Sequence, residues 1–396
     1  MTTSILFACS IAMLGVSGLG LWLDRGRRGG LLEMTALLAL LPLVAVVSGR
    51  WLPTPFSIVL VVGLVVALLS RSRDDVLHSE CALKLLWVMG PALAVSFAGI
   101  GLLAIATGTS INVEQWAVLA MPAESTMLWT ISLSLSLIAG FVLLGGAPFH
   151  FWAADLMQGS RAWVAALAVS ALQACGAAWF AWRLEGLDAL PDAAHIAGAL
   201  LGSGAAVAFV VGAITLPFQR RPERRVGTLA SINGGLLLAT LAVRFGGAPT
   251  AAANFQVPLW SAHLALALSG AATLAPFLPV TVRVPAPGTV LFRRHPAWGA
   301  IGLYSLASLA GVPGTPGAFI WFGVARMLVA ASRTELVMLL ALAWVTAFAI
   351  VVRQVREAYG VWSEAPMPPR GVPAAARWAM LVGCLGLVAM AVGLRG

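Results

Sequence analysis

The sequence predicts an all-α polytopic membrane protein with about 12 transmembrane helices, arranged as two inverted five-helix repeats, each with a broken fourth helix. The first observation behind this prediction is composition: the chain is 60% hydrophobic and only 10% charged. A soluble domain of this length carries far more charge. The second is that glycine and proline clusters interrupt two apolar stretches, and the third is that arginines concentrate in alternate loops.

Apolar stretches that can cross a bilayer recur along the whole chain. A membrane helix needs about 20 predominantly apolar residues. On this criterion we expect spans near residues 2–23, 31–49, 55–70, 82–106, 127–157, 161–183, 194–217, 226–243, 258–281, 297–331, 335–352 and 373–394. Two of these stretches, 127–157 and 297–331, are too long for one straight helix.

Each of the two long spans contains a run of helix-breaking residues. The first carries GGAP at 145–148, and the second carries GVPGTPG at 311–317. Proline removes a backbone donor and glycine loosens the helical turn. We therefore expect each span to consist of two half-helices within a single crossing.

The distribution of arginines gives an orientation. The odd-numbered loops carry most of them, whereas the even-numbered loops carry only Arg50, Arg183, Arg244 and Arg333. Basic residues are enriched in cytoplasmic loops, so the odd loops should face the cytoplasm and both termini should lie outside. If either broken span counted as two crossings, the later basic loops would fall on the wrong side. We predict a multi-pass protein of the inner (cytoplasmic) membrane.

The order of the spans suggests an internal repeat. Spans two to six and spans seven to eleven form two sets of five, and the broken span is the fourth in each. An odd number of spans per set gives the sets opposite orientations, and interrupted helices at corresponding positions of inverted repeats are typical of transporters. We predict an N-terminal span in 1–30, a first repeat over 31–183, a second over 194–357 and a C-terminal span in 373–396.

Several other functions are disfavoured. The cysteines are scattered without metal-ligand spacing, so we expect free thiols, no metal site and no cofactor on this chain. The net charge of +9 follows from arginines in loops, and no nucleic-acid partner is expected. Residues 1–23 lack a basic start and a clear cleavage site, which favours a retained span over a signal peptide.

One segment carries a strong family signature. PFHFWAADLMQG at 148–159 resembles the PFHxWxPDxxxG motif of the antiporter-like (Mrp-type) membrane subunits of respiratory complex I, and in particular NADH-quinone oxidoreductase subunit N. SECALKLLWVMG at 79–90 is similar to the family's SEAxxKYxLLG, with Lys84 on the family's lysine. RRVGTLASINGG at 224–235 is similar to KRLLxYSSIxHxG, with Asn233 where a histidine is usual. The resemblance covers roughly residues 55–357.

The resemblance also implies where protons should move. Members of this family use a buried glutamate in the second helix of the first repeat, and lysines before the first break, in the next helix and in the second broken helix. A buried lysine can take and release a proton because desolvation lowers its pKa and a carboxylate raises it. Carried over without gaps from Lys84, Pro148 and Pro313, these positions fall on Val59, Leu143, Gln173 and Trp321. None of these four residues exchanges a proton at physiological pH, and arginine cannot replace them because it stays protonated.

Two remaining candidates lie near the cytoplasmic ends of their spans. Lys84 is in the first turn of its span near Glu80, and we favour a snorkelling ion pair over a role in a proton relay. Asp155 belongs to the signature, where we expect it to cap the short helix or to pair with Arg161.

The other two candidates are histidines. His150 could carry a proton because its pKa lies near neutrality, although we favour a hydrogen bond across the helix break. His263 lies close to the outer end of its span beside Trp260, where it could simply touch water. An ionisable group within a membrane is a functional candidate by default, so His263 is the best single candidate for residual proton handling.

The combined prediction is an antiporter-like membrane-arm subunit of a complex I-like quinone oxidoreductase, with a degenerate proton path and a structural or coupling role. By resemblance, the redox centres lie on other chains, and the partners are other membrane subunits and the lipid bilayer. One alternative is an active proton or cation translocator that uses non-standard residues. The other is a scaffold subunit of a different membrane redox complex.

Overall fold

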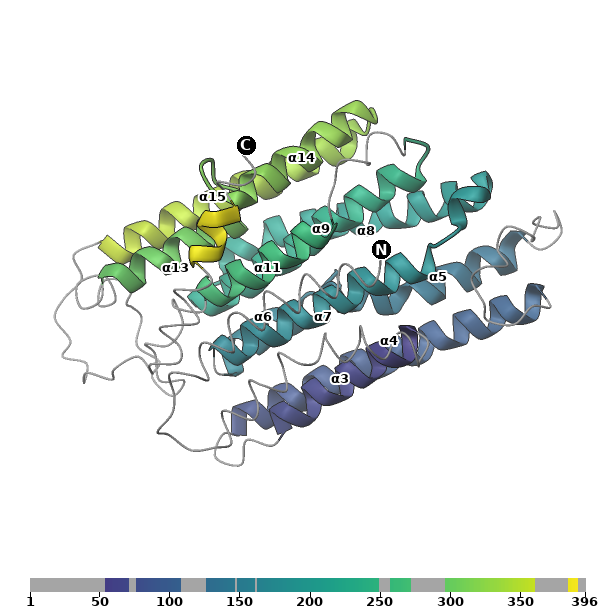
Figure 1. Cartoon of the computed structure of the whole chain (residues 1–396), viewed down its shortest axis with the longest axis horizontal. Coiled ribbons are helices and arrows are strands. Elements are labelled where there is room, and N and C mark those ends of the chain that lie inside the picture. Colours follow the sequence, from purple (N-terminus) through teal and green to yellow (C-terminus); the bar gives the residue numbers. More distant parts are fainter. Residues whose placement is uncertain are drawn as a thin grey trace.

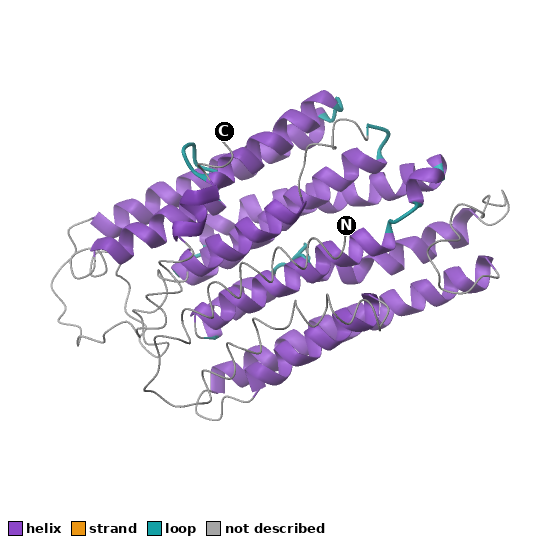
Figure 2. Ribbon diagram, viewed as in Figure 1, coloured by secondary structure: helices purple, strands orange, loops and turns teal. Residues whose placement is uncertain are grey.

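The computed structural model describes residues 54–70, 76–107, 126–146, 148–160, 162–248, 257–271, 296–359 and 384–390. Helices account for nearly all of these residues and run roughly side by side (Figure 1), and the described residues contain no strand (Figure 2). The predicted spans near 2–23 and 31–49 lie outside the described residues, as does most of the span near 373–394.

The described helices follow the predicted order of spans. They are α3 (Thr54–Ser70), α4 (Val76–Thr107), α5 (Thr126–Leu143), α6 (Phe151–Gly159), α7 (Ala162–Arg183), α8 (Pro191–Phe218), α9 (Pro222–Phe245), α11 (Val257–Ala271), α13 (Pro296–Leu309), α14 (Pro316–Ala330) and α15 (Thr334–Tyr359). A short 3-10 helix, η3 (Leu187–Ala189), joins α7 to α8. Five of the described helices are long and apolar enough to cross a membrane: α4, α7, α8, α9 and α15.

Both predicted helix breaks are confirmed. The first separates α5 from α6, and the second separates α13 from α14. In each, a glycine takes the left-handed conformation that ends a helix at low steric cost, with φ of +71° at Gly145 and +68° at Gly311.

The two breaks have the same hydrogen-bond pattern. Gly146 N–H donates to the Phe141 carbonyl at 2.7 Å and Gly145 N–H donates to Val142 at 2.9 Å. At the second break, Val312 N–H donates to Ala307 at 2.9 Å and Gly311 N–H donates to Ser308 at 3.1 Å. This pair of bonds is a Schellman motif. At each helix end it provides partners for two of the last backbone carbonyls. The carbonyls that follow them along the chain are left to bind other groups.

The packing of helices also repeats. In the first half α4 contacts α3 and α5, and α7 contacts α3 and α5. In the second half α11 contacts α9 and α13, and α15 contacts α9 and α13. These are equivalent neighbours if the predicted repeats are superimposed in chain order. The residue boundaries of the repeats and of the terminal spans stay a prediction.

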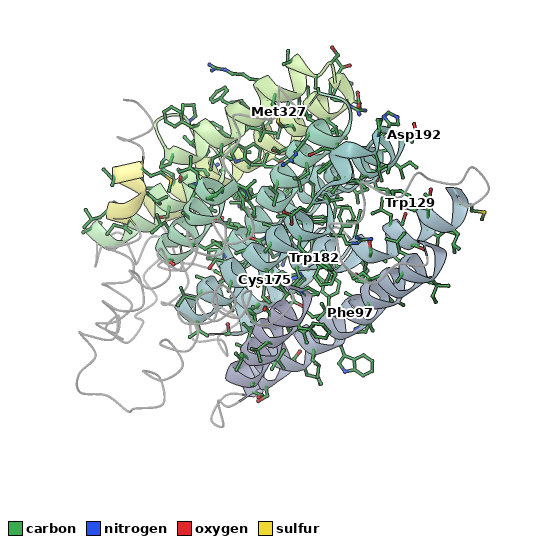
Figure 3. The ribbon with its side chains drawn as sticks, turned by 45° about the vertical axis from the view of Figure 1, so that its right-hand side comes forward. Phe97, Trp129, Cys175, Trp182, Asp192 and Met327 are labelled. Atoms are coloured by element: carbon green, nitrogen blue, oxygen red, sulfur yellow. The ribbon has the colours of Figure 1, made fainter. Side chains whose placement is uncertain are left out.

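The two halves meet on α9, which lies at the centre of the bundle. Its whole apolar stretch is buried, as is nearly all of α7, and α9 contacts α6, α7, α8, α11, α13, α14 and α15. Figure 3 shows Cys175 of α7 within the bundle and Asp192 of α8 at its margin. The centre of the fold is therefore where α7, α9 and both breaks come together.

Candidate functional site: the two helix breaks and the helix between them

An amide side chain caps the first break. Gln173 of α7 is fully buried, and its Nε2 donates to the Leu144 carbonyl at 2.8 Å and to the Ala230 carbonyl of α9 at 2.9 Å. Leu144 follows the last residue of α5, so its carbonyl belongs to the negative end of that helix dipole. A Cβ on Gly234 would stand 2.4 Å from the same carbonyl, which requires glycine where α9 passes the break.

A second amide caps the second break. Asn233 of α9 is fully buried, and its Nδ2 donates to the Leu309 carbonyl and to the Leu229 carbonyl, both at 2.9 Å. The Trp321 indole N–H donates to Leu309 as well, at 3.2 Å. The last carbonyl of α13 therefore receives two side-chain donors, neither of which is charged.

His263 lies at the second break and is enclosed by the bundle. Its exposed fraction is 0%, so the prediction of an interfacial histidine is wrong. The helices α7, α9, α13 and α14 pack against α11, and Ser308 and Gly317, on the two sides of the second break, lie beside the His263 ring. His263 Nε2 lies 2.9 Å from Ser308 Oγ, which also accepts the Gly317 N–H of α14 at 3.1 Å. This histidine thus ties α11 to both halves of the broken helix.

These contacts form a polar line from one break to the other, which we call the central axis. It runs from Gln173 to Ala230 on α9, then one turn along α9 to Asn233, and on to Leu309. The neighbouring residue Ser308 continues it to His263. His263 is the one ionisable side chain on this axis, so the axis can orient dipoles but has almost no place to store charge.

The positions of the expected proton carriers lie mostly on or beside this axis. Leu143 and Gln173 are fully buried, and Trp321 is 1% exposed. Val59 is 38% exposed, whereas its neighbours on α3, Ile58 and Val62, are buried. The exact register matters little, since the sequences of α3 and α5 contain no aspartate, glutamate, lysine, arginine or histidine at all.

The candidates Lys84 and Asp155 are brought together at one end of the bundle. Lys84 Nζ pairs with Glu80 at 2.6 Å, which confirms that ion pair, and lies 3.9 Å from Asp155. Asp155 binds Arg224 of α9 at 2.6 Å; Arg161 lies outside the described residues. These groups are partly exposed and make a surface ion-pair cluster, separate from the central axis.

His150 lies in the turn before α6 and is half-buried. Its backbone carbonyl accepts a hydrogen bond from Ser231 Oγ of α9 at 3.4 Å. The structure thus places His150 near α9 at the first break, while His263 belongs to the second. The predicted hydrogen bond of the His150 side chain across the break stays a prediction.

One charged contact has no counterpart in the sequence analysis. The Arg225 side chain is 0% exposed and donates to both Glu357 carboxylate oxygens of α15, at 2.7 Å and 3.0 Å. It also donates to Gln354 Oε1. Because 132 residues separate Arg225 from Glu357, no local pattern could have shown this pair. With Arg224 bound to α6, the two adjacent arginines hold elements of both halves.

The geometry supports positioning and does not support storage of charge. Among the described residues, no group of three or more histidine, cysteine, aspartate or glutamate side chains could hold a metal ion. Cys81 and Cys175 are buried thiols that take part in no disulfide, and the Cys81 thiol donates to the Asp155 carbonyl at 3.5 Å. The side chains that donate to the backbone carbonyls at the breaks are amides, indoles and hydroxyls, which hold these carbonyls in place without changing protonation state.

Comparisons with known proteins agree with the sequence signature. No protein-family model matches the chain. It is 32% identical over 186 residues to NADH-quinone oxidoreductase subunit N 1 of Solidesulfovibrio magneticus, covering 47% of this chain and 38% of that protein. It is 31% identical over 179 residues to subunit N of Xanthomonas euvesicatoria, covering 44% of this chain and 36% of that protein. The match to subunit N of Alkalilimnicola ehrlichii is 29% over 233 residues, 58% of this chain and 47% of that protein. The aligned parts thus span less than half of these relatives.

Solved structures show the same fold over nearly the whole chain. A chain of respiratory complex I from Thermus thermophilus with bound aureothin superimposes with a TM-score of 0.75 at 22% identity, covering 98% of this chain and 84% of that one. A chain of the archaeal membrane-bound sulfane sulfur reductase gives a TM-score of 0.70 at 15% identity, covering 100% of this chain and 88% of that one. A chain of the Mrp complex from a Dietzia species gives a TM-score of 0.67 at 15% identity, covering 98% of this chain and 81% of that one. The predicted resemblance and fold class are both confirmed.

Proposed function

We propose that this chain is an antiporter-like membrane-arm subunit of a complex I-like quinone oxidoreductase whose own proton path is degenerate. Its likeness to NADH-quinone oxidoreductase subunit N over 179–233 residues supports the assignment to such an assembly. In this proposal the chain carries no redox centre. It serves as a structural and coupling element beside other membrane subunits, in the inner membrane and with both termini outside.

The observation that carries the degenerate path is the makeup of the central axis. Proton carriage within a membrane needs groups that change charge and are held by a partner. The axis joins both breaks, yet Gln173 and Asn233 are the side chains that hold the carbonyls of Leu144 and Leu309. An amide donates the same hydrogen bond that an ammonium would donate, but it never releases a proton at physiological pH. The arrangement keeps the geometry of the breaks and lacks the chemistry of a relay.

The alternative of an active translocator has one observation in its favour. His263 is fully buried and contacts Ser308 at a helix break, which is where a switchable group could act. A relay also needs a next group within reach. The described residues within hydrogen-bond distance of the His263 ring offer Ser308 alone, and its hydroxyl already accepts the Gly317 N–H. We therefore favour a latch that holds α11, α13 and α14 together.

Affinity purification of the full chain from its native membranes tests the proposed assembly. The proposal predicts that redox subunits and quinone-reducing activity copurify with it. Recovery with membrane chains that have no quinone-reducing activity would instead support the scaffold alternative.

The intact assembly also tests the degenerate path. His263→Ala should leave the number of protons translocated per electron unchanged, measured with a pH-sensitive dye during quinone reduction. A lower ratio at unchanged assembly and electron-transfer rate would show that His263 moves protons. Asn233→Leu is the matched control, because it removes an axis side chain that cannot titrate.

A further inference from the structure

Four arginines gather at the end of the bundle where α8 turns into α9 and where α15 ends. Arg220 and Arg221 lie in the turn between α8 and α9, and Arg353 and Arg356 lie in the last two turns of α15. The Arg353 guanidinium donates to the Pro217 carbonyl near the end of α8 at 3.3 Å. The two pairs therefore occupy adjoining parts of one surface, which we call the arginine surface.

The buried Arg225 holds the two parts of this surface together. Besides binding Glu357 of α15, it donates to the Gln219 carbonyl at 3.0 Å and to the Arg220 carbonyl at 3.4 Å. The backbone of the turn is thereby tied to the end of α15. The exposed arginines of the two segments are thus brought together by the fold itself and without a ligand.

The arginine surface carries an excess of positive charge. Glu357 is shared between Arg225 and Arg353. Glu223, the acidic residue in the first turn of α9, is buried. Within the part of the chain that the structure describes, no carboxylate forms an ion pair with the other three arginines of the surface. An anion is therefore the partner whose charge complements this surface.

Exposed apolar side chains lie next to the arginines on both helices. On α8 they are Ile214 and Phe218, which is 79% exposed, and on α15 they are Phe348 and Val352, which is 52% exposed. Within each pair the residues are four positions apart, so they share one face of their helix. Because α8 and α15 pack against each other and both can cross a membrane, these faces form an apolar surface that is open to the bilayer.

The boundary between the two kinds of surface lies where the spans end. The span of α8 ends at Phe218 and that of α15 ends at Glu357, so the arginines stand at the edge of the apolar layer. A molecule that covers both surfaces must carry its negative charge at this edge and its apolar part within the bilayer. That is the construction of an anionic phospholipid, and basic sites between membrane helices bind such headgroups.

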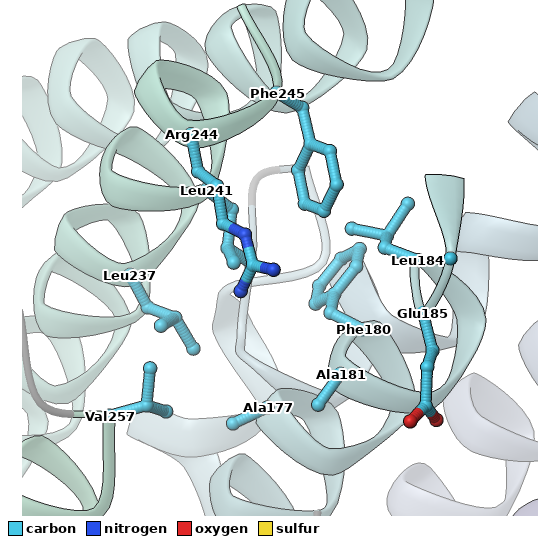
Figure 4. Close-up of a pocket in the computed structure, with 11 residues that line it drawn as sticks. Ala177, Phe180, Ala181, Leu184, Glu185, Leu237, Leu241, Arg244, Phe245 and Val257 are labelled. Carbon is cyan, nitrogen blue, oxygen red and sulfur yellow. The ribbon is translucent and has the colours of Figure 1, made fainter. Parts of the chain in front are cut away.

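The pocket in Figure 4 does not offer the same combination. It has a volume of about 130 Å³ and lies at the opposite end of α9. Its apolar lining, which includes Phe180, Leu237 and Leu241, is buried on α7 and α9. The arginine surface differs because its apolar side chains are exposed.

The arginines have donors to spare for a phosphate. A guanidinium carries five N–H donors, and Arg353 uses two of them, for Glu357 and for the Pro217 carbonyl. The remaining donors can bind a phosphate oxygen. Arginines in loops also fix the orientation of a membrane protein through their charge alone. That role does not require arginines from two segments to adjoin each other and an exposed apolar face, whereas lipid binding does.

We propose that the arginine surface binds an anionic phospholipid, with its phosphate on Arg220 and Arg353 and one acyl chain over Phe218 and Val352. A zwitterionic lipid has the same phosphate, but its cationic headgroup would meet further arginines. This site is independent of the proposed function.

Lipid titration of the purified full chain tests the proposal. The chain is delipidated in detergent and titrated with phosphatidylglycerol and phosphatidylcholine of identical acyl chains, and bound lipid is counted by native mass spectrometry. Phosphatidylglycerol should bind roughly fivefold or more tightly than phosphatidylcholine, and an excess of glycerol 3-phosphate should not displace it. Equal affinities of the two lipids would overturn the proposal and leave this face to a neighbouring protein. Displacement by glycerol 3-phosphate would also overturn it, because the site would then bind a free phosphate.

Variants separate recognition of the headgroup from general association with lipid. Arg220→Gln and Arg353→Gln should each weaken phosphatidylglycerol binding roughly fivefold and leave phosphatidylcholine binding unchanged. Phe218→Asn should weaken the binding of both lipids, because it removes apolar contact. Arg326→Gln is the matched control, since Arg326 is exposed on α14 and does not belong to the arginine surface. Unchanged phosphatidylglycerol affinity in both Arg220→Gln and Arg353→Gln, or an equal loss in Arg326→Gln, would contradict the assignment.

Discussion

Gln173 should stabilise the first break through its amide, and Gln173→Met tests this directly. Methionine has nearly the same length and volume but no donor. The substitution removes two hydrogen bonds, to Leu144 at 2.8 Å and to Ala230 at 2.9 Å, from a fully buried site. The Ala230 carbonyl belongs to the interior of α9 and can keep its helical partner. The Leu144 carbonyl follows the end of α5 and has no such partner within that helix.

The expected cost follows from these two bonds. Hydrogen bonds between helices in a membrane are worth about 0.6 kcal/mol on average and up to about 1.7 kcal/mol. Two bonds, one of which leaves a carbonyl unsatisfied, give a destabilisation of roughly 1–3 kcal/mol. The measurement is the free energy of unfolding of the purified chain in mixed micelles titrated with a denaturing detergent.

Ser269→Ala is the matched control for Gln173→Met. Ser269 is also buried, but its hydroxyl donates to Ala265 within its own helix, and that carbonyl retains its backbone bond when the hydroxyl is removed. We expect a change of about 0.5 kcal/mol or less for the control. If Gln173→Met were no more destabilising than Ser269→Ala, the role assigned to the amide would be refuted.

Two further substitutions test other contacts of the fold by the same measurement. Gly317→Ala should destabilise the chain by about 2–4 kcal/mol, because the new Cβ would stand 1.7 Å from the Ser308 carbonyl. The control is Gly323→Ala, which should be nearly neutral because a Cβ at Gly323 would have no atom within 4 Å. Equal effects of the two substitutions would contradict the packing described at the second break. Arg225→Gln should cost roughly 2–3 kcal/mol, less than a fully buried pair because Glu357 is 34% exposed. The control is Arg353→Gln, which removes a more exposed partner of the same glutamate and should cost less than about 1 kcal/mol. If Arg353→Gln were more destabilising than Arg225→Gln, the role assigned to Arg225 would be ruled out.

The sequence predicted the breaks well because their cause is local. Glycine and proline act on the backbone where they stand, so the runs at 145–148 and 311–317 identify the ends of α5 and α13 without any knowledge of neighbours. Helix ends without such residues were less certain. The helix α4 begins at Val76, six residues before the predicted span at 82–106, because polar residues extend a helix beyond its apolar part.

The contacts of the site were less predictable because they depend on distant segments. The partner of Asp155 in the described structure is Arg224, 69 residues away, and the partner of Arg225 is 132 residues away. The burial of His263 depends on α13 and α14 packing over it, which its position near a span end does not indicate. What the sequence did establish is the lack of ionisable residues in α3 and α5, since that follows from composition alone and needs no register.

Proton flux through the isolated chain is the most direct test of the central claim. The full chain is reconstituted into liposomes with an enclosed pH-sensitive dye, and uptake is followed after a jump in pH and membrane potential. An axis of amides, indoles and hydroxyls with a single histidine, which has no second titratable group beside it, predicts uptake equal to that of liposomes without protein. Saturable uptake that His263→Ala abolishes would contradict the account, because it would show a working proton path through the breaks.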